Sequence, residues 1–212
     1  IMGWMTDHNG KLRIAYAIVG GTNTSLLYRK TEKDEFKNVL TTNFKESLSP
    51  LFFTFDNKNI YASSNLGRDK SAIVIYDIEN AKEIKTIFEN KDYDVSSLSY
   101  SRKRKVITAA SYTSWKRQRY FFDKETENMF NNLKKSLGKY EIAITSHTKN
   151  EDKFIVRTYS DRSLGAYYLY DKNTNKLDKI CDVSPWLNEN DLAEMKPIEY
   201  KSRDGLTIHG YL

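Results

Sequence analysis

The stretch YYLYDKNTNK (residues 167–176) decides the fold, because three earlier segments of the chain repeat its form. It is an apolar and aromatic run that ends on an aspartate and continues into a polar turn. Such runs favour strands, and an Asp before Asn or Thr favours a turn because its carboxylate accepts hydrogen bonds from backbone amides further on. The earlier copies are SLLYRK (25–30), IVIYDI (73–78) and RYFFDK (119–124). Aligned on Arg29, Asp77, Asp123 and Asp171, the copies are 48, 46 and 48 residues apart.

A second predicted strand precedes each copy and follows the same period. These strands are RIAYAIV (13–19), NIYASSN (59–65), KVITAAS (105–111) and KFIVRTY (153–159), whose isoleucines step by 46, 47 and 48 residues. Further strands are expected at LFFTF (51–55), VSSLSY (95–100), EIAITSH (141–147), KEIKTIF (82–88) and KLDKICD (176–182). A unit of about 47 residues with four short strands has the size of a β-propeller blade. A β-sandwich is the structural rival, but sandwiches do not repeat a four-strand unit at a fixed period.

We therefore predict an all-β chain: a partial β-propeller of about four four-stranded antiparallel blades over residues 1–185, with one or two short helices. One helix is expected in residues 124–140, where apolar residues recur at helical spacing and Gly138 can end the helix. We expect it to take the place of the outer strand of the third blade. A second short helix is expected within residues 184–195, with Ser184 as its cap and Pro185 at its first position.

Charge and composition exclude several classes of protein. A mean hydropathy of -0.68 and the lack of a long apolar run exclude a membrane-spanning helix. Residues 101–140 hold eleven Lys and Arg against three acidic residues, in the clusters RKRK (102–105) and KRQR (116–119) beside Trp115. Nucleic-acid binding through this basic face stays an alternative, but we do not expect it because no nucleic-acid motif accompanies the charge. A solvated turn and strand face is the simpler interpretation.

The sequence contains no recognisable catalytic constellation. The nucleophile pattern G-x-S-x-G of α/β-hydrolases is absent, and His8, His147 and His209 lie far apart without metal-ligand spacing. The single cysteine, Cys181, excludes an internal disulfide and gives no Cys/His metal pattern. We therefore predict no catalytic, cofactor-binding or metal-binding residue within residues 1–212, and no cofactor. The opening IMGWMTDHNG has no signal-peptide pattern, and because Ile1 is not an initiator residue the sequence assigns no compartment.

The last 60 residues carry a resemblance to a known family. SDR (160–162), YYLYD (167–171), LAEMKPIEY (192–200) and SRDGLTIHGYL (202–212) resemble the end of the propeller, the linker and the first peptidase strand of the prolyl oligopeptidase family of serine peptidases. The acylaminoacyl-peptidase-like and dipeptidyl-peptidase-like branch is the most similar. TDHNGKLRIAYAI (6–18) also resembles the start of a mid-propeller blade in that branch. The likeness is specific at the end of the chain and loose between residues 80 and 150.

The resemblance implies a function for a longer protein. In this family a seven-bladed propeller caps an α/β-hydrolase domain that bears Ser, Asp and His, and the cap admits peptides while excluding folded proteins. It implies that residues 1–185 are blades, residues 186–201 a linker with a short helix, and residues 202–212 the first strand of a hydrolase domain whose triad lies beyond Leu212. The expected partners are that missing domain and, through the full-length enzyme, a peptide substrate; this fragment itself is expected to be inactive.

Two further expectations are independent of the family. The alternative function is a non-enzymatic β-propeller module that binds proteins or peptides. If the ring is open, its end blades expose strand edges and apolar faces, which favour self-association. We therefore expect a homo-oligomer that forms through the open ends.

Overall fold

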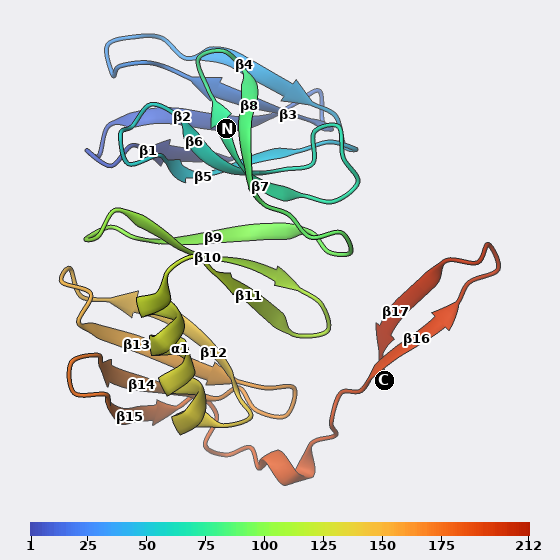
Figure 1. The fold of residues 1–212 in the computed structure, drawn as a ribbon. Helices are drawn as coiled ribbons and strands as arrows, with labels where there is room; N and C mark the ends of the chain where they lie inside the picture. The colour runs from blue at the N-terminus through green and yellow to red at the C-terminus, as the bar shows by residue number, and fades with distance from the viewer. The chain divides into compact units, whose positions relative to one another are not determined.

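The computed structural model describes all residues 1–212 and consists mainly of antiparallel strands (Figure 1). Strands that are consecutive in sequence are neighbours in each sheet. The first sheet contains β1 (Gly3–Thr6), β2 (Leu12–Val19), β3 (Asn23–Tyr28) and β4 (Lys37–Thr42). The second contains β5 (Leu48–Phe53), β6 (Ile60–Ser64), β7 (Ala72–Asp77) and β8 (Lys82–Phe88).

The remaining strands continue the pattern with one exception. The third sheet has three strands: β9 (Val95–Ser101), β10 (Val106–Thr113) and β11 (Arg117–Phe121). The fourth contains β12 (Glu141–His147), β13 (Lys153–Tyr159), β14 (Ala166–Asp171) and β15 (Lys176–Asp182). A separate hairpin pairs β16 (Pro197–Lys201) with β17 (Thr207–Tyr211). The prediction of an all-β partial propeller is confirmed, with three four-stranded sheets and one three-stranded sheet.

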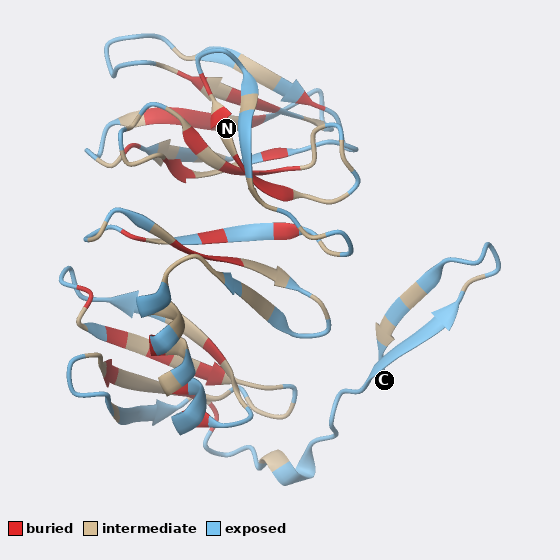
Figure 2. Cartoon of the chain, viewed as in Figure 1, coloured by how far each residue is buried: buried red, intermediate tan, exposed pale blue.

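The chain divides into two compact units: residues 1–100 with 105–122, and residues 101–104 with 123–212. In the first unit the buried side chains follow the central strands β2, β6 and β7 (Figure 2). Ile14, Ile60 and Val74 are fully buried there in one apolar cluster. Burial of one such side chain stabilises a fold by roughly 1.5–3 kcal/mol. The apolar runs that predict these strands therefore also form the core.

The predicted helix is α1 (Lys124–Leu137), and local sequence explains both of its ends. The Asp123 carboxylate accepts a hydrogen bond from the Thr126 N–H at 2.9 Å, which caps the first turn. Gly138 ends the helix with a φ of 66°. The third sheet lacks an outer strand, as expected. The buried face of α1 packs within the second unit, against the core of the fourth sheet; this cluster contains Met129, Leu133, Leu137, Ile142, Phe154, Val156 and Tyr170.

Arg104 reinforces the start of α1. Its guanidinium donates two hydrogen bonds to the Asp123 carboxylate, at 2.7 and 2.8 Å. This bidentate contact holds the pKa of Asp123 well below its usual range. The RKRK cluster that contains Arg104 thus supplies a structural ion pair to the second unit.

The turn between the first two strands of each sheet contains one left-handed residue. These residues are Gly10, Asn57, Lys105 and Glu151, with φ values of 80°, 58°, 52° and 53°. They repeat at the period of the sheets, although only the first is a glycine. Two of them accept hydrogen bonds from the preceding turn: Asn57 Oδ1 from the His8 N–H at 3.0 Å, and Glu151 Oε1 from the Lys103 N–H at 3.1 Å. Two of the three neighbouring pairs of turns are therefore linked side chain to backbone.

The prediction of a helix that begins at Ser184 and Pro185 is wrong. The segment forms only a 3-10 turn, Glu189–Asp191, and its cap is Asn188, whose side chain accepts from the Asn190 N–H at 3.1 Å. Asn and Asp side chains compete with helical backbone bonds, and this stretch is rich in both. No helix of the structure has the length and apolar character needed to cross a membrane.

Gly165, between β13 and β14, should tolerate no side chain. Its φ is +83°, and a Cβ there would lie 1.7 Å from the Thr158 carbonyl oxygen. Gly165→Ala should lower the free energy of unfolding by more than the roughly 1–2 kcal/mol that a left-handed residue alone costs. Gly10→Ala is the matched control, because its φ is +80° and no atom lies within 4 Å of the added Cβ. Equal effects of the two substitutions in urea denaturation would contradict this expectation.

Candidate functional site

The loop between β13 and β14 is a tightly hydrogen-bonded turn over residues 160–165. Ser160 and Ser163 form an isolated antiparallel bridge. The Ser160 hydroxyl accepts a hydrogen bond from the Arg162 N–H at 3.1 Å, and the Ser163 hydroxyl accepts one from the Gly165 N–H at 3.1 Å. These local bonds fix the loop backbone, so the side chains of Asp161 and Arg162 project from a rigid base.

The segment that follows β15, which we call the exit segment (residues 183–196), lies against this loop. The Val183 N–H donates to the Gly165 carbonyl at 2.8 Å. Arg162 donates from Nε and Nη2 to the Glu189 main-chain oxygen at 2.9 and 2.5 Å. Asp161 Oδ2 accepts from the Met195 N–H at 2.8 Å. Two adjacent loop residues therefore hold the exit segment at two points.

A third contact fixes the side chain of Glu189. The Tyr140 hydroxyl donates to Glu189 Oε1 at 2.5 Å, and Lys139 Nζ lies 3.3 Å from Oε2. The bond from Tyr140, followed by the contact with Lys139, lowers the pKa of Glu189 despite an opposing effect of burial. The same bond raises the pKa of Tyr140 to about 12, because ionised Tyr140 could not donate to a carboxylate. We call the contacts between this loop, Tyr140 and the exit segment the junction. The junction is thus most stable with Tyr140 neutral and Glu189 charged.

The exit segment continues directly into the hairpin of β16 and β17. Main-chain hydrogen bonds of 2.8 and 2.9 Å join Lys196 to Leu212, and the Ser202 and Gly205 backbones close the turn. The strand at residues 207–211 therefore pairs with the residues just before it. His209 Nδ1 lies 3.1 Å from Glu199 across this pair. Several large side chains of the hairpin are exposed: Ile198, Tyr200, Leu206, Tyr211 and Leu212.

The junction is where the residues of the sequence resemblance meet. SDR (160–162) supplies both anchors, and the stretch from Leu192 to Tyr200 begins at the anchored turn and ends in β16. From the sequence we predicted no site residue here, and no sequence pattern singles out Tyr140 or Glu189. Arg162 binds a main-chain oxygen, which any residue at position 189 would provide, so no pairing of residue types could reveal it. What this arrangement can do is hold and orient the polypeptide that leaves the fourth sheet.

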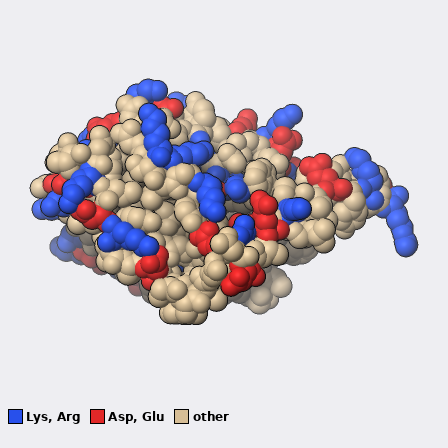
Figure 3. Space-filling model, turned by 90° about the horizontal axis from the view of Figure 1, so that it is seen from below, with Lys and Arg blue, Asp and Glu red and all other residues tan.

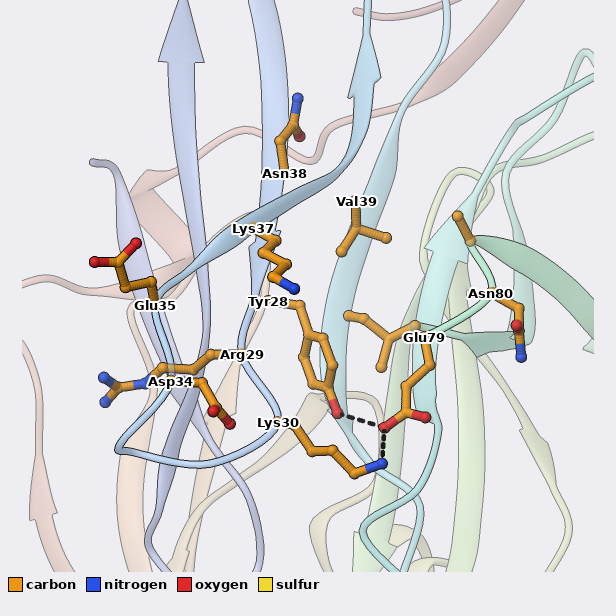
Figure 4. A pocket seen from close by; sticks show the side chains of 12 residues that line it. Tyr28, Arg29, Lys30, Asp34, Glu35, Lys37, Asn38, Val39, Glu79 and Asn80 are labelled. Carbon is orange, nitrogen blue, oxygen red and sulfur yellow. Dashed lines mark hydrogen bonds and ion pairs between the residues drawn. The ribbon is translucent and has the colours of Figure 1, made fainter.

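The first unit contains a second candidate, a cavity of about 680 Å³ near the ends of β3 and β7. The Tyr28 hydroxyl donates to Glu79 Oε1 at 3.2 Å, and Lys30 Nζ lies 3.2 Å from the same oxygen (Figure 4). Burial raises the pKa of Tyr28 more strongly than the nearby Arg13 lowers it. The lining residues are Tyr28, Arg29, Lys30, Asp34, Glu35, Lys37, Asn38, Val39, Ile78, Glu79, Asn80 and Ala81.

The charged groups of this cavity are largely engaged with the protein. Asp34 accepts from the backbone and hydroxyl of Thr31, and Arg29 donates to the main-chain oxygens of Leu12 and Glu32. Tyr28 also accepts a hydrogen bond from the buried Arg13, which donates to the Asn57 carbonyl at 2.8 Å and lies 3.7 Å from Asp7. The lining therefore shows no nucleophile beside a base. The hydrogen bonds of Tyr28 with Glu79 and of Arg13 with the Asn57 carbonyl join the first two sheets.

The three histidines occupy separate places. His8 Nε2 lies 2.8 Å from the Phe53 carbonyl, His147 Nδ1 lies 3.0 Å from the Thr148 carbonyl, and His209 faces Glu199. No group of three or more His, Cys, Asp or Glu side chains is arranged to hold a metal ion.

Lys and Arg are interspersed with Asp and Glu on the face that Figure 3 displays. Lys116 lies over Trp115, with its Nζ 4.5 Å from the ring centroid.

Comparisons with known proteins agree with this architecture. No family model matches the chain. A dipeptidyl aminopeptidase BIII from Pseudoxanthomonas mexicana is 24% identical over 185 residues, which is 87% of this chain. Prolyl oligopeptidase B from Galerina marginata, with a bound 35mer substrate, superposes on 99% of the chain with a TM-score of 0.66 and 16% identity. Dipeptidyl peptidase 4 from Porphyromonas gingivalis superposes on 90% with a TM-score of 0.57 and 14% identity.

These matches confirm the resemblance to prolyl oligopeptidase-family peptidases. The chain spans only part of each relative: 26% of the aminopeptidase, 30% of prolyl oligopeptidase B and 27% of the dipeptidyl peptidase. At these identities the solved structures establish the fold, and the matched portion corresponds to propeller blades.

The junction should weaken at both extremes of pH. The lowered pKa of Glu189 gives a stabilisation that is complete above its ordinary value of 4.5 and is lost as the pH falls through the folded value. The raised pKa of Tyr140 gives a stabilisation that is complete below 10.0 and is lost as the pH rises through about 12. The difference between ultraviolet titrations of the wild type and Tyr140→Phe should isolate Tyr140. Its midpoint should return toward 10.0 in Glu189→Gln, and an ordinary wild-type midpoint would refute the contact.

Proposed function

We propose that this chain is the propeller portion of a prolyl-oligopeptidase-like serine peptidase, and that it limits access of peptides to a catalytic domain beyond residue 212. This proposal rests on one observation, which combines the fold of the chain with the share of a known peptidase that it matches. The whole chain superposes on about 30% of a peptidase that binds a 35mer substrate. The residues described here offer no catalytic set of their own, so hydrolysis would belong to the remaining part of the protein.

The proposed division of the chain follows the repeat and the junction. Residues 1–185 would be blades, residues 186–201 the linker and residues 202–212 the first part of the hydrolase domain. The hairpin adds a detail to this division, because β16 already lies within the linker range. The exposed apolar residues of the hairpin, among them Tyr200, Leu206 and Tyr211, would be covered by that domain.

The test compares the peptidase activity of the 212-residue chain with that of the protein translated from the complete reading frame. The purified 212-residue chain should hydrolyse no peptide or ester substrate, while the protein translated from the complete reading frame should cleave short peptides and react with a serine-directed fluorophosphonate. The label should map outside residues 1–212. An open reading frame that stops after Leu212, or one that continues without a G-x-S-x-G nucleophile, would favour the non-enzymatic binding module instead.

We also propose that the isolated chain self-associates through its terminal sheets. Large apolar side chains near the first strand are exposed, including Ile1, Met2 and Trp4 at 63%, 63% and 56%. Apolar patches of this kind favour association in water. Small-angle scattering should show an apparent mass that rises with protein concentration, and Trp4→Lys should reduce the rise. Trp186→Lys on the exit segment is the control, and a strictly monomeric profile at high concentration would exclude the proposal.

A further inference from the structure

The exit segment is held by polar contacts with little apolar burial. Trp186, Leu192 and Met195 are 77%, 39% and 49% exposed, so the segment contributes almost nothing to the core of the second unit. Beyond Val183, its fixed points are Glu189 and the N–H of Met195. The Glu189 carbonyl accepts from Arg162, and the Glu189 carboxylate is bound by Tyr140 and Lys139. Segments with few buried contacts open at a lower free energy than the sheets that carry them.

We propose that Arg162 and Asp161 form a releasable latch for the exit segment. In the closed latch both anchors are made, and the hairpin of β16 and β17 leaves the fourth sheet in one fixed direction. In the open latch both anchors are broken, and the hairpin moves while β12–β15 stay folded. No covalent change is involved, so the latch is a conformational equilibrium of this chain.

The two sides of the latch differ in stiffness, as a latch requires. The loop side is fixed by the Ser160–Ser163 bridge and by Gly165, which no other residue can replace without a clash. The segment side is a single 3-10 turn between exposed residues. Opening therefore breaks the bonds of Arg162 and Asp161, together with the contacts of Glu189 with Tyr140 and Lys139, and leaves the loop backbone unchanged.

The positions of the anchors explain how the latch would control direction. Arg162 holds residue 189 and Asp161 holds residue 195, so the intervening backbone is fixed at both ends. The second anchor lies next to Lys196, whose backbone makes the first hydrogen bonds of the hairpin with Leu212. Loss of the Asp161 anchor would therefore free the hairpin at its base, whereas loss of the Arg162 anchor would free the turn that precedes it.

The effect of this motion on peptide access rests on the proposed function, but the latch itself does not. Its test uses the 212-residue chain and hydrogen–deuterium exchange by mass spectrometry, with no peptidase measurement. Arg162→Gln shortens the side chain and removes its charge, so exchange of residues 187–196 should become at least about tenfold faster, as expected from the loss of charge-assisted hydrogen bonds. Exchange of β12–β15 should not change. Arg203→Gln, an exposed arginine of the hairpin turn, is the matched control and should leave residues 187–196 unchanged.

A second pair of variants separates a latch from a general loss of structure. Asp161→Ala removes the acceptor and should accelerate exchange at residues 194–198. Asp161→Asn keeps an amide oxygen that can accept from the Met195 N–H, so it should restore most of the protection. Unchanged exchange in both Arg162→Gln and Asp161→Ala would overturn the latch. Faster exchange throughout β12–β15 would also overturn it, because these residues would then be part of the sheet's own stability.

Discussion

The repeat depends on contacts that fix one turn against the next, and hydrogen bonds between turns supply two of them. A four-stranded sheet satisfies its own backbone, but nothing within it fixes its neighbour. At two of the four turns, the side chain of the left-handed residue supplies such a link. Asn57 accepts from the His8 N–H and Glu151 from the Lys103 N–H. A non-glycine residue in this conformation is strained, and the hydrogen bond to a neighbouring turn compensates for the strain.

The link requires a side chain that can accept a hydrogen bond as well as a left-handed backbone, and the turn at Lys105 shows that the backbone alone is not enough. Lys105 has the same left-handed backbone, but its ammonium group is a donor only and cannot accept an N–H. The second and third sheets are joined by packed aromatic side chains, including Phe52 with Tyr100 and Phe88 with Tyr120, whose ring centroids lie 4.3 and 4.6 Å apart. A hydrogen bond from Ser63 Oγ to the Val95 carbonyl, at 2.8 Å, also joins them. Apolar packing and hydrogen bonds therefore occur together at both joints of the first unit, and the bond between turns is specific to the first of them.

Most of the strands could be predicted from the sequence because the central strands are short apolar runs, in which several consecutive residues are buried in β2, β6, β7 and β10. β8, β12, β13 and β15 have the predicted bounds. β1, β4 and β16 carry no such signal: β4 is KNVLTT, and β16 is exposed along its whole length. Their place in a sheet is set by a neighbouring strand, so local residues do not reveal it. The helix expected from Ser184 was wrong for a related reason. The backbone of that segment is fixed by contacts with a distant loop and not by its own periodicity.

The junction was invisible in sequence because Arg162 and Asp161 recognise backbone atoms. A guanidinium that binds a carbonyl oxygen, or a carboxylate that binds an amide N–H, places no demand on the side chain of its partner. The bond from Arg162 makes no demand on the side chain at position 189, although Tyr140 and Lys139 bind the carboxylate of Glu189 there. Position 195 can hold any residue except proline, which lacks the N–H. The residue type matters in the loop. Arg162 must supply two convergent donors, and position 165 must be a glycine because its conformation leaves no room for a Cβ. The informative signature of the two main-chain anchors therefore lies in the loop that holds the segment, and Glu189 is the residue of the segment whose side chain adds a further contact.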